Sequence, residues 1–159
     1  SQLEDGDVDG VYEYLVEPAL HEFASLTFED VCKEFVRELQ KKNALPFRYT
    51  KMGRWTGKTT VRDKNAESGL RVTETEIDLL GIGRGAKEYL VGECKFKHSP
   101  FDYSEYLDTI AKLTPLKDKA KFYYALFSES GFDEKIAVEA QDSDTLFLYS
   151  LETVVNFEK

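Results

Sequence analysis

Residue types that often carry chemistry are scarce in this chain. Its 159 residues include two cysteines, two histidines and one tryptophan. Cys32 and Cys94 are far apart in sequence and cannot form a CxxC pair, so we expect two small, buried, reduced side chains rather than a disulfide. His21 and His98 are unpaired in sequence, and we expect both to be ordinary surface residues.

Long apolar runs are absent as well. No stretch approaches the roughly 18 apolar residues needed to cross a bilayer, and no secretory leader with a charged start and an apolar core opens the chain. We therefore expect a cytoplasmic protein with no membrane partner. Residues 1–9 are acidic and contain glycine, which is typical of a disordered or artificially added tail, and residues 10–159 are expected to form a single domain.

Positive charge is in deficit, but it is concentrated in one stretch. The chain has 21 basic and 30 acidic residues, for a net charge of −9. Residues 1–38 carry two basic and eleven acidic side chains, whereas residues 39–64 carry eight basic side chains and one acidic one. The basic stretch predicts DNA phosphate contacts through Arg48, Lys51, Arg54, Lys58 and Arg62. Exposed basic residues also serve solubility alone, and so acidic a chain is expected to bind DNA weakly by itself.

Three charged residues interrupt two apolar segments that have the pattern of buried strands. Asp78 lies in residues 75–82, and Glu93 and Lys95 lie in residues 89–96. A buried charge without a partner is costly, so these charges are expected to compensate one another or to bind a metal. Because side chains alternate along a strand, Glu93 and Lys95 project to one face and Cys94 to the other.

The link between these segments, residues 81–85, is rich in glycine and predicts a hairpin that brings Asp78 opposite Glu93. Two carboxylates beside an ammonium suit Mg²⁺ or Mn²⁺, which take hard oxygen ligands. Lys95 is then expected to orient or deprotonate a metal-bound water, or to stabilise charge on a phosphate. Glu76 projects to the same side as Asp78 and is a substitute ligand.

This pattern resembles a known superfamily. Asp78, fourteen intervening residues and then Glu93-Cys94-Lys95 resemble the D…(D/E)xK signature of the PD-(D/E)XK nucleases. Further segments resemble, in order, the nuclease-like C-terminal domain attached to archaeal-type AAA ATPases: residues 26–32, 52–55, 76–78, 92–95 and 127–132. The resemblance covers roughly residues 20 to 150.

The resemblance implies a three-layer, restriction-endonuclease-like α/β fold with a central mixed sheet of four to five strands flanked by helices. It implies metal-dependent hydrolysis of DNA by Asp78, Glu93 and Lys95, with Glu29 and the Cys94 backbone carbonyl as further metal ligands. An ATPase domain, in cis or in trans, is the implied partner. The chain departs from the family at residues 56–75, an insertion that is expected to form a longer hairpin.

Periodicity predicts the elements around the motif. We expect a short helix at residues 18–23, a second helix from an N-cap at Thr27 to about residue 42, and a helix over 102–114 that ends before Pro115. Further elements are expected at residues 47–56, 59–63, 122–127 and 145–149 as strands and at 132–140 as a helix. Glu29, in the first turn of its helix, is also explained by interaction with the helix dipole.

Three other interpretations stay open. The domain could be a DNA-binding module with a vestigial site, or a protein-interaction module that serves an ATPase domain. It could also be a domain in which the charged residues form only a structural ion cluster. The sequence leaves the oligomeric state open, a homo-oligomer included.

Overall fold

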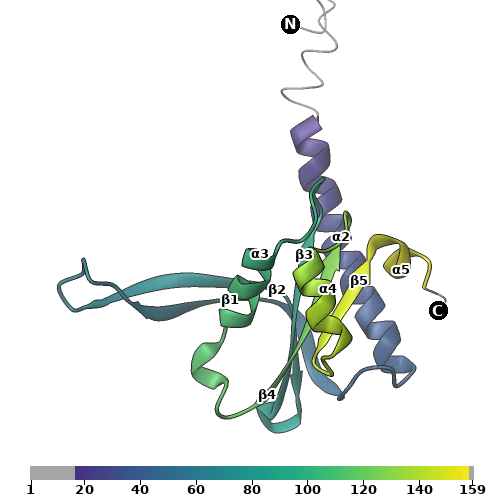
Figure 1. Cartoon of the computed structure of the whole chain (residues 1–159). Coiled ribbons are helices and arrows are strands. Elements are labelled where there is room, and N and C mark those ends of the chain that lie inside the picture. Colours follow the sequence, from purple (N-terminus) through teal and green to yellow (C-terminus); the bar gives the residue numbers. More distant parts are fainter. Residues whose placement is uncertain (1–16, 158–159) are drawn as a thin grey trace, which may run out of the picture.

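The structure is a computed structural model that describes residues 17–157 and arranges them around a mixed sheet (Figure 1). The five strands lie in sequence order across the sheet: β1 (Tyr49–Arg62), β2 (Leu70–Gly83), β3 (Glu88–Lys95), β4 (Lys121–Ser128) and β5 (Leu146–Ser150). The first three form an antiparallel meander, whereas β3, β4 and β5 run parallel. The tail predicted at residues 1–9 lies outside the described residues.

Helices cover both faces of this sheet. They are α2 (Glu17–Lys41), α3 (Tyr103–Ala111), α4 (Glu134–Gln141) and α5 (Leu151–Val155). Phe28 of α2 and Val154 of α5 share a core with Phe127 of β4, while Tyr106 of α3 shares another core with the adjacent Leu126. Because neighbouring strand residues point to opposite faces, α2 and α5 cover one face and α3 the other. The predicted three-layer α/β fold with a mixed sheet is confirmed.

A single helix replaces the two that the sequence predicts between residues 18 and 42. α2 is unbroken, and the Thr27 hydroxyl donates a hydrogen bond to the Phe23 carbonyl, at 2.9 Å, instead of capping a new helix. The predicted N-cap at Thr27 is therefore wrong, because a threonine hydroxyl can also bond back to the preceding turn within a helix. Glu29 lies in the middle of α2, where the helix dipole does not explain it.

β1 and β2 continue far beyond the body of the protein (Figure 1). The strands predicted at residues 47–56 and 59–63 are one strand, which pairs with β2 as far as Arg62 and Leu70. The longer hairpin expected at residues 56–75 is confirmed, and we call residues 56–75 the arm. β3 pairs with β2 only from Leu79 to Ile82, so the arm has no third strand among the described residues.

Trp55 fixes the root of the arm. Its side chain packs against the core that contains Ile77 and Val91. Its ring also lies over Gly57, where an added Cβ would overlap Trp55 Cη2 and Cζ2. Glycine is therefore needed at residue 57 because the indole uses the space of a side chain.

Gly57→Ala is expected to push the Trp55 ring off the arm and to lower the free energy of unfolding by about 1 to 2 kcal/mol. Trp55 is the only tryptophan of the 159 residues, so a red shift of the fluorescence emission reports this displacement. Gly53→Ala is the matched control, since a Cβ on this β1 glycine meets no atom within 4 Å. An unchanged emission maximum in Gly57→Ala would contradict the prediction.

The elements after β3 follow the sequence prediction, with one addition. α3 begins at the N-cap Asp102, whose side chain accepts from the Glu105 N–H at 2.9 Å, and it ends before Pro115. The short helix α5 follows β5 directly and is capped by Ser150. Periodicity did not predict α5, because five residues are too few to show a helical pattern. None of the helices described between residues 17 and 157 is long and apolar enough to cross a membrane.

Candidate functional site

Asp78 lies at an irregularity of the sheet. The pairing of β1 with β2 shifts register there, so that Arg54 alone faces two residues, Asp78 and Leu79. Leu79 consequently packs in the core under α2, while Ile77, which an unbroken strand would place on the same face, packs in the core on the other side. Such a β-bulge re-aims side chains and is common beside active sites.

The hydrogen-bonded ladder between β2 and β3 ends next to this bulge. Leu79 and Gly92 form the last pair of their ladder, and the next residues along the two strands are Asp78 and Glu93. The Cys94 N–H donates to Asp78 Oδ2 at 2.9 Å, so the carboxylate serves the backbone of β3 where the ladder ends. The predicted hairpin is confirmed, and with it the position of Asp78 opposite Glu93.

Glu93 is buried, with 5% of its surface exposed. Lys112, the C-cap of α3, donates from Nζ to Glu93 Oε1 and to the Glu76 carbonyl. Burial and the neighbouring Asp78 carboxylate raise the pKa of Glu93 to about 7, although Lys112 acts in the opposite direction. The Glu93 carboxyl group therefore changes charge near neutral pH.

Arg54 gathers three carboxylates. Its Nη1 lies 3.0 Å from Glu29 Oε2 and 3.3 Å from Asp78 Oδ1, and its Nη2 lies 3.0 Å from Glu76 Oε2. Burial and the Asp78 carboxylate raise the pKa of Glu29, which Arg54 partly opposes. The middle of α2 thus brings Glu29 to the same cluster as Asp78, as expected for a further ligand.

Lys95 lies beside a different acid. Its Nζ is 3.5 Å from Glu105 Oε2 and 5.9 Å from the centre of the Phe101 ring. Lys97 contacts the other Glu105 oxygen at 2.6 Å. The ammonium that contacts Glu93 in this structure is therefore that of Lys112, while Lys95 lies on the α3 side next to Glu105.

Sequence reasoning missed Lys112 and gave Arg54 only a role in DNA binding. Lys112 follows the last turn of an amphipathic helix, where a lysine has an ordinary explanation at the helix C-terminus. The weak signal for Arg54 was its place beside Trp55 in a segment that resembles the nuclease-like family. Neither position reveals, without the tertiary structure, which carboxylate it faces.

The Cys94 side chain lies on the opposite face of β3 from Glu93, as predicted, and packs against the core under α2. Contact with the Cys32 thiol and burial raise the pKa of Cys94 well above its ordinary value. Both cysteines are free. Because a thiol that stays protonated is a poor metal ligand, the Cys94 side chain is not expected to bind an ion, and the expected role of its backbone carbonyl stays a prediction.

The other residues predicted to contact DNA are exposed. Lys51, Lys58 and Arg62 lie on β1, and Arg48 precedes it and donates to Asn43 Oδ1 at 3.2 Å. Arg54 differs from these four because its guanidinium is engaged by the carboxylates. Arg48, Lys51, Lys58 and Arg62 are accessible from solvent, and their contact with DNA stays a prediction.

The cluster contains the ligand chemistry of a divalent-cation site but not its arrangement. The side chains that meet there are four carboxylates and two cations: Glu29, Glu76, Asp78 and Glu93, with Arg54 and Lys112. When all six are ionised, the net charge of the cluster is −2. The carboxylate oxygens are the ligands that Mg²⁺ prefers. Within residues 17–157 no group of three or more His, Cys, Asp or Glu side chains is placed to hold a metal ion. Arg54 and Lys112 contact the carboxylates of the cluster instead. An ion could bind only by replacing some of these contacts.

Comparisons with known proteins return relatives of undetermined activity. "Uncharacterized protein MJECL04" of Methanocaldococcus jannaschii is 30% identical over 136 residues, which cover 83% of this chain and 26% of the relative. The chain thus spans about a quarter of that relative's length. The crystal structure of a protein of unknown function, AF1548, is similar with a TM-score of 0.43 and 19% identity, over 80% of this chain and 59% of that one. A family model described as "Archaea bacterial proteins of unknown function" matches residues 1–107. Since that match covers more than half of the sequence, the chain belongs to this family, DUF234.

Proposed function

We propose that this domain hydrolyses DNA phosphodiester bonds with the help of a divalent metal, as a PD-(D/E)XK nuclease-like module. The observation that carries the proposal is the convergence of Asp78 and Glu93 where β2 and β3 separate, with Lys95 two residues further along β3. Burial raises the pKa of Glu93 to about 7, so its ionised form destabilises the fold near neutral pH. A buried acid with a raised pKa beside a β-bulge is typical of a functional site.

In this proposal Asp78 and Glu93 hold Mg²⁺ or Mn²⁺, with Glu29 and the Cys94 carbonyl as further ligands. A bound ion supplies charge stabilisation and a water of lowered pKa. Lys95 orients the attacking water or stabilises charge on the phosphate, and its partly exposed ammonium beside Glu105 is accessible for either role. Arg54 and Lys112 balance the carboxylates before an ion binds.

The domain is proposed to act as part of a longer protein. Its M. jannaschii relative is about four times as long as the matched region, which accommodates the ATPase domain expected in cis. An ATPase in trans is the other form of the same proposal. The cytoplasmic location expected from the sequence stays a prediction.

The affinity for Mn²⁺ is expected to increase as the pH rises from 6 to 8. The Glu93 carboxyl has a pKa of about 7 without metal, so its proton must leave before the carboxylate can bind an ion. Below pH 7 that proton competes with the ion, and above pH 7 the competition ends. Calorimetric titration with MnCl₂ at several pH values measures the effect.

Glu93→Gln is the control for this titration. It should bind Mn²⁺ weakly at every pH and lose the pH dependence, because the titrating carboxyl is gone. Equal affinities of wild type and Glu93→Gln would show that Glu93 is not a ligand and would remove the main support for the proposal.

A second candidate function, a catalytically inactive DNA-binding or protein-interaction module, is favoured by one observation. Arg54 and Lys112 already pair with all four carboxylates, which is what a structural ion cluster requires. Incubation of duplex and single-stranded DNA with the protein in Mg²⁺, Mn²⁺ or EDTA separates the candidates. DNA binding without metal-dependent cleavage supports the inactive module, and no DNA affinity at low salt supports the protein-interaction module.

A further inference from the structure

The arm carries an exposed apolar surface that the fold of one chain leaves uncovered. Leu70 and Val72, both more than half exposed, lie near its end on β2. Cross-strand pairing of Leu70 with Arg62 and of Glu74 with Lys58 places two basic side chains on the same face as these apolar residues. This arm face therefore combines apolar side chains with Arg62 at its end and with the oppositely charged pair Lys58 and Glu74 nearer the body.

A two-stranded ribbon of this kind is not stable on its own. From Thr56 to Arg62 the arm extends roughly 20 Å, at about 3.3 Å per residue, without a third strand among the described residues. An isolated two-stranded hairpin is at best marginally stable in water unless it packs against something else. We therefore expect the arm to be covered when the protein is in its functional state.

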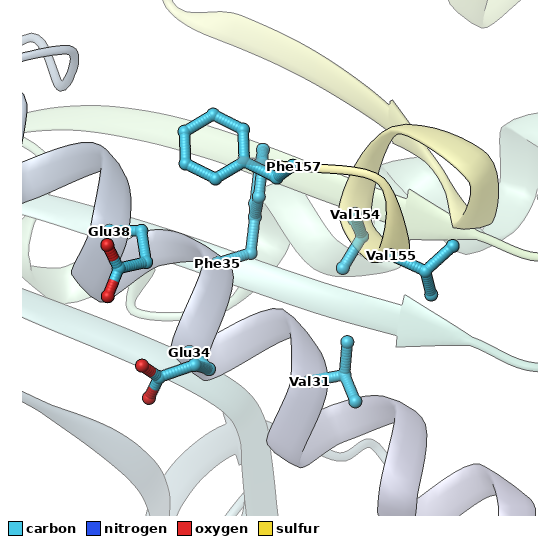
Figure 2. A pocket seen from close by; sticks show the side chains of 7 residues that line it. All are labelled: Val31, Glu34, Phe35, Glu38, Val154, Val155 and Phe157. Atoms are coloured by element: carbon cyan, nitrogen blue, oxygen red, sulfur yellow. The ribbon is translucent and has the colours of Figure 1, made fainter. Parts of the chain in front are cut away.

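A second exposed apolar surface lies between α2 and α5. We call it the apolar groove, and it is lined by Phe23, Phe28, Val31, Phe96, Leu151 and Val155. Phe23 and Val155 are more than half exposed, as is the adjacent Leu26. The groove continues along α2 past Val31 and Val155 to a pocket that Glu34, Glu38 and Phe157 also line (Figure 2).

The arm cannot fill the apolar groove of its own chain. It leaves the body on the side away from α5 (Figure 1). The two surfaces are nevertheless complementary in chemistry. Both expose aliphatic or aromatic side chains, and the arm face adds Arg62 beside Leu70, whereas α2 carries five acidic and three basic residues besides Glu29 of the carboxylate cluster. Opposite charges at the edges of an apolar contact fix its register and speed association.

We infer that the arm of one copy of this chain docks in the apolar groove of a second copy, and that the exchange is reciprocal. A two-fold axis places each arm on the partner's groove, so a single pair of surfaces is used twice and both exposed apolar patches are buried. The inference does not depend on the nuclease proposal, since none of the residues in the contact belongs to the carboxylate cluster.

Light scattering or sedimentation equilibrium on the full chain, over concentrations up to about 0.1 mM, tests the inference. Wild type should be a dimer. A double variant Leu70→Glu with Val72→Glu should be monomeric or weakened by about 30-fold or more, as expected when a hot-spot residue is lost. Phe23→Glu should have the same effect from the groove side. These side chains are exposed, so the variants should keep the circular dichroism and melting behaviour of a folded chain.

Mixing the two variants identifies the contact. In a reciprocal dimer, the intact arm of Phe23→Glu fits the intact groove of the Leu70→Glu, Val72→Glu chain, so the mixture should regain part of the dimer. Val138→Glu, an exposed apolar position on α4, is the matched control and should stay dimeric. A monomeric wild type, or a dimer that survives the Phe23→Glu change, would overturn the inference. If the wild type is monomeric, another part of the longer protein is the alternative occupant of the apolar groove.

Discussion

Asp78→Asn is expected to lower the rate of Mg²⁺- or Mn²⁺-dependent DNA cleavage by at least about 100-fold, the usual effect of removing one group that stabilises charge at an active site. Asparagine keeps an oxygen that can accept the Cys94 N–H, so the junction of β2 and β3 is preserved. It loses the negative charge that holds the ion. Initial rates on labelled duplex DNA, at saturating Mn²⁺ and in EDTA, measure the effect.

Glu74→Gln is the matched control for this change. It removes the same charge from the same strand, but Glu74 lies on the arm and is exposed to solvent. Its cleavage rate should stay within about twofold of the wild-type rate, because a surface charge away from the site contributes little. Cleavage by Asp78→Asn at the wild-type rate would refute the assignment of Asp78 as a metal ligand.

Glu93→Gln is expected to gain stability relative to wild type as the pH rises. The folded-state pKa of Glu93 is raised from 4.5 to about 7, so the folded protein binds more protons than the unfolded chain between these two values. The stability that the protonated acid contributes is present below pH 4.5 and is lost as the pH rises to 7. At about 1.4 kcal/mol per pKa unit, the loss in wild type amounts to about 3 kcal/mol.

Denaturant unfolding of both proteins from pH 4.5 to 8, in EDTA, measures this difference. The free energy of unfolding of Glu93→Gln should approach that of wild type at the acid end and exceed it at the alkaline end. Lys112→Met should lower the free energy of unfolding below that of wild type above pH 7, because it removes the cation that contacts the ionised Glu93. A difference between Glu93→Gln and wild type that is constant with pH would show that Glu93 does not titrate in this range.

The residues that follow strand periodicity were predicted well. Alternation along β3 correctly separates Glu93 from Cys94, and the glycine-rich link at residues 81–85 correctly predicts the hairpin that brings Asp78 opposite Glu93. Both inferences use the geometry of one strand or one turn, which a local sequence pattern determines. The mixed sheet was predicted from the order of helices and strands along the chain, which is also read directly from the sequence.

Inferences that needed partners from distant segments were less successful. Thr27 has the chemistry of an N-cap, but in α2 its hydroxyl bonds to the preceding turn, and the helix continues because its apolar face packs on the sheet. Lys112 and Arg54 are ordinary basic residues in sequence. They become part of the cluster only because the end of α3 and the bulge opposite Arg54 meet the acids of β2 and β3.

The sequence by itself determined the acid pair, the faces of β3 and the layered α/β class, because these depend on residue type and on the two-residue period of a strand. The tertiary structure alone decided three further features. It brings Glu29 to the site from the middle of a long helix, and it gives each carboxylate a protein cation. It also extends residues 56–75 into an arm away from the body. The physical reason is that charge compensation and burial depend on distances in space, which spacing along the chain does not determine.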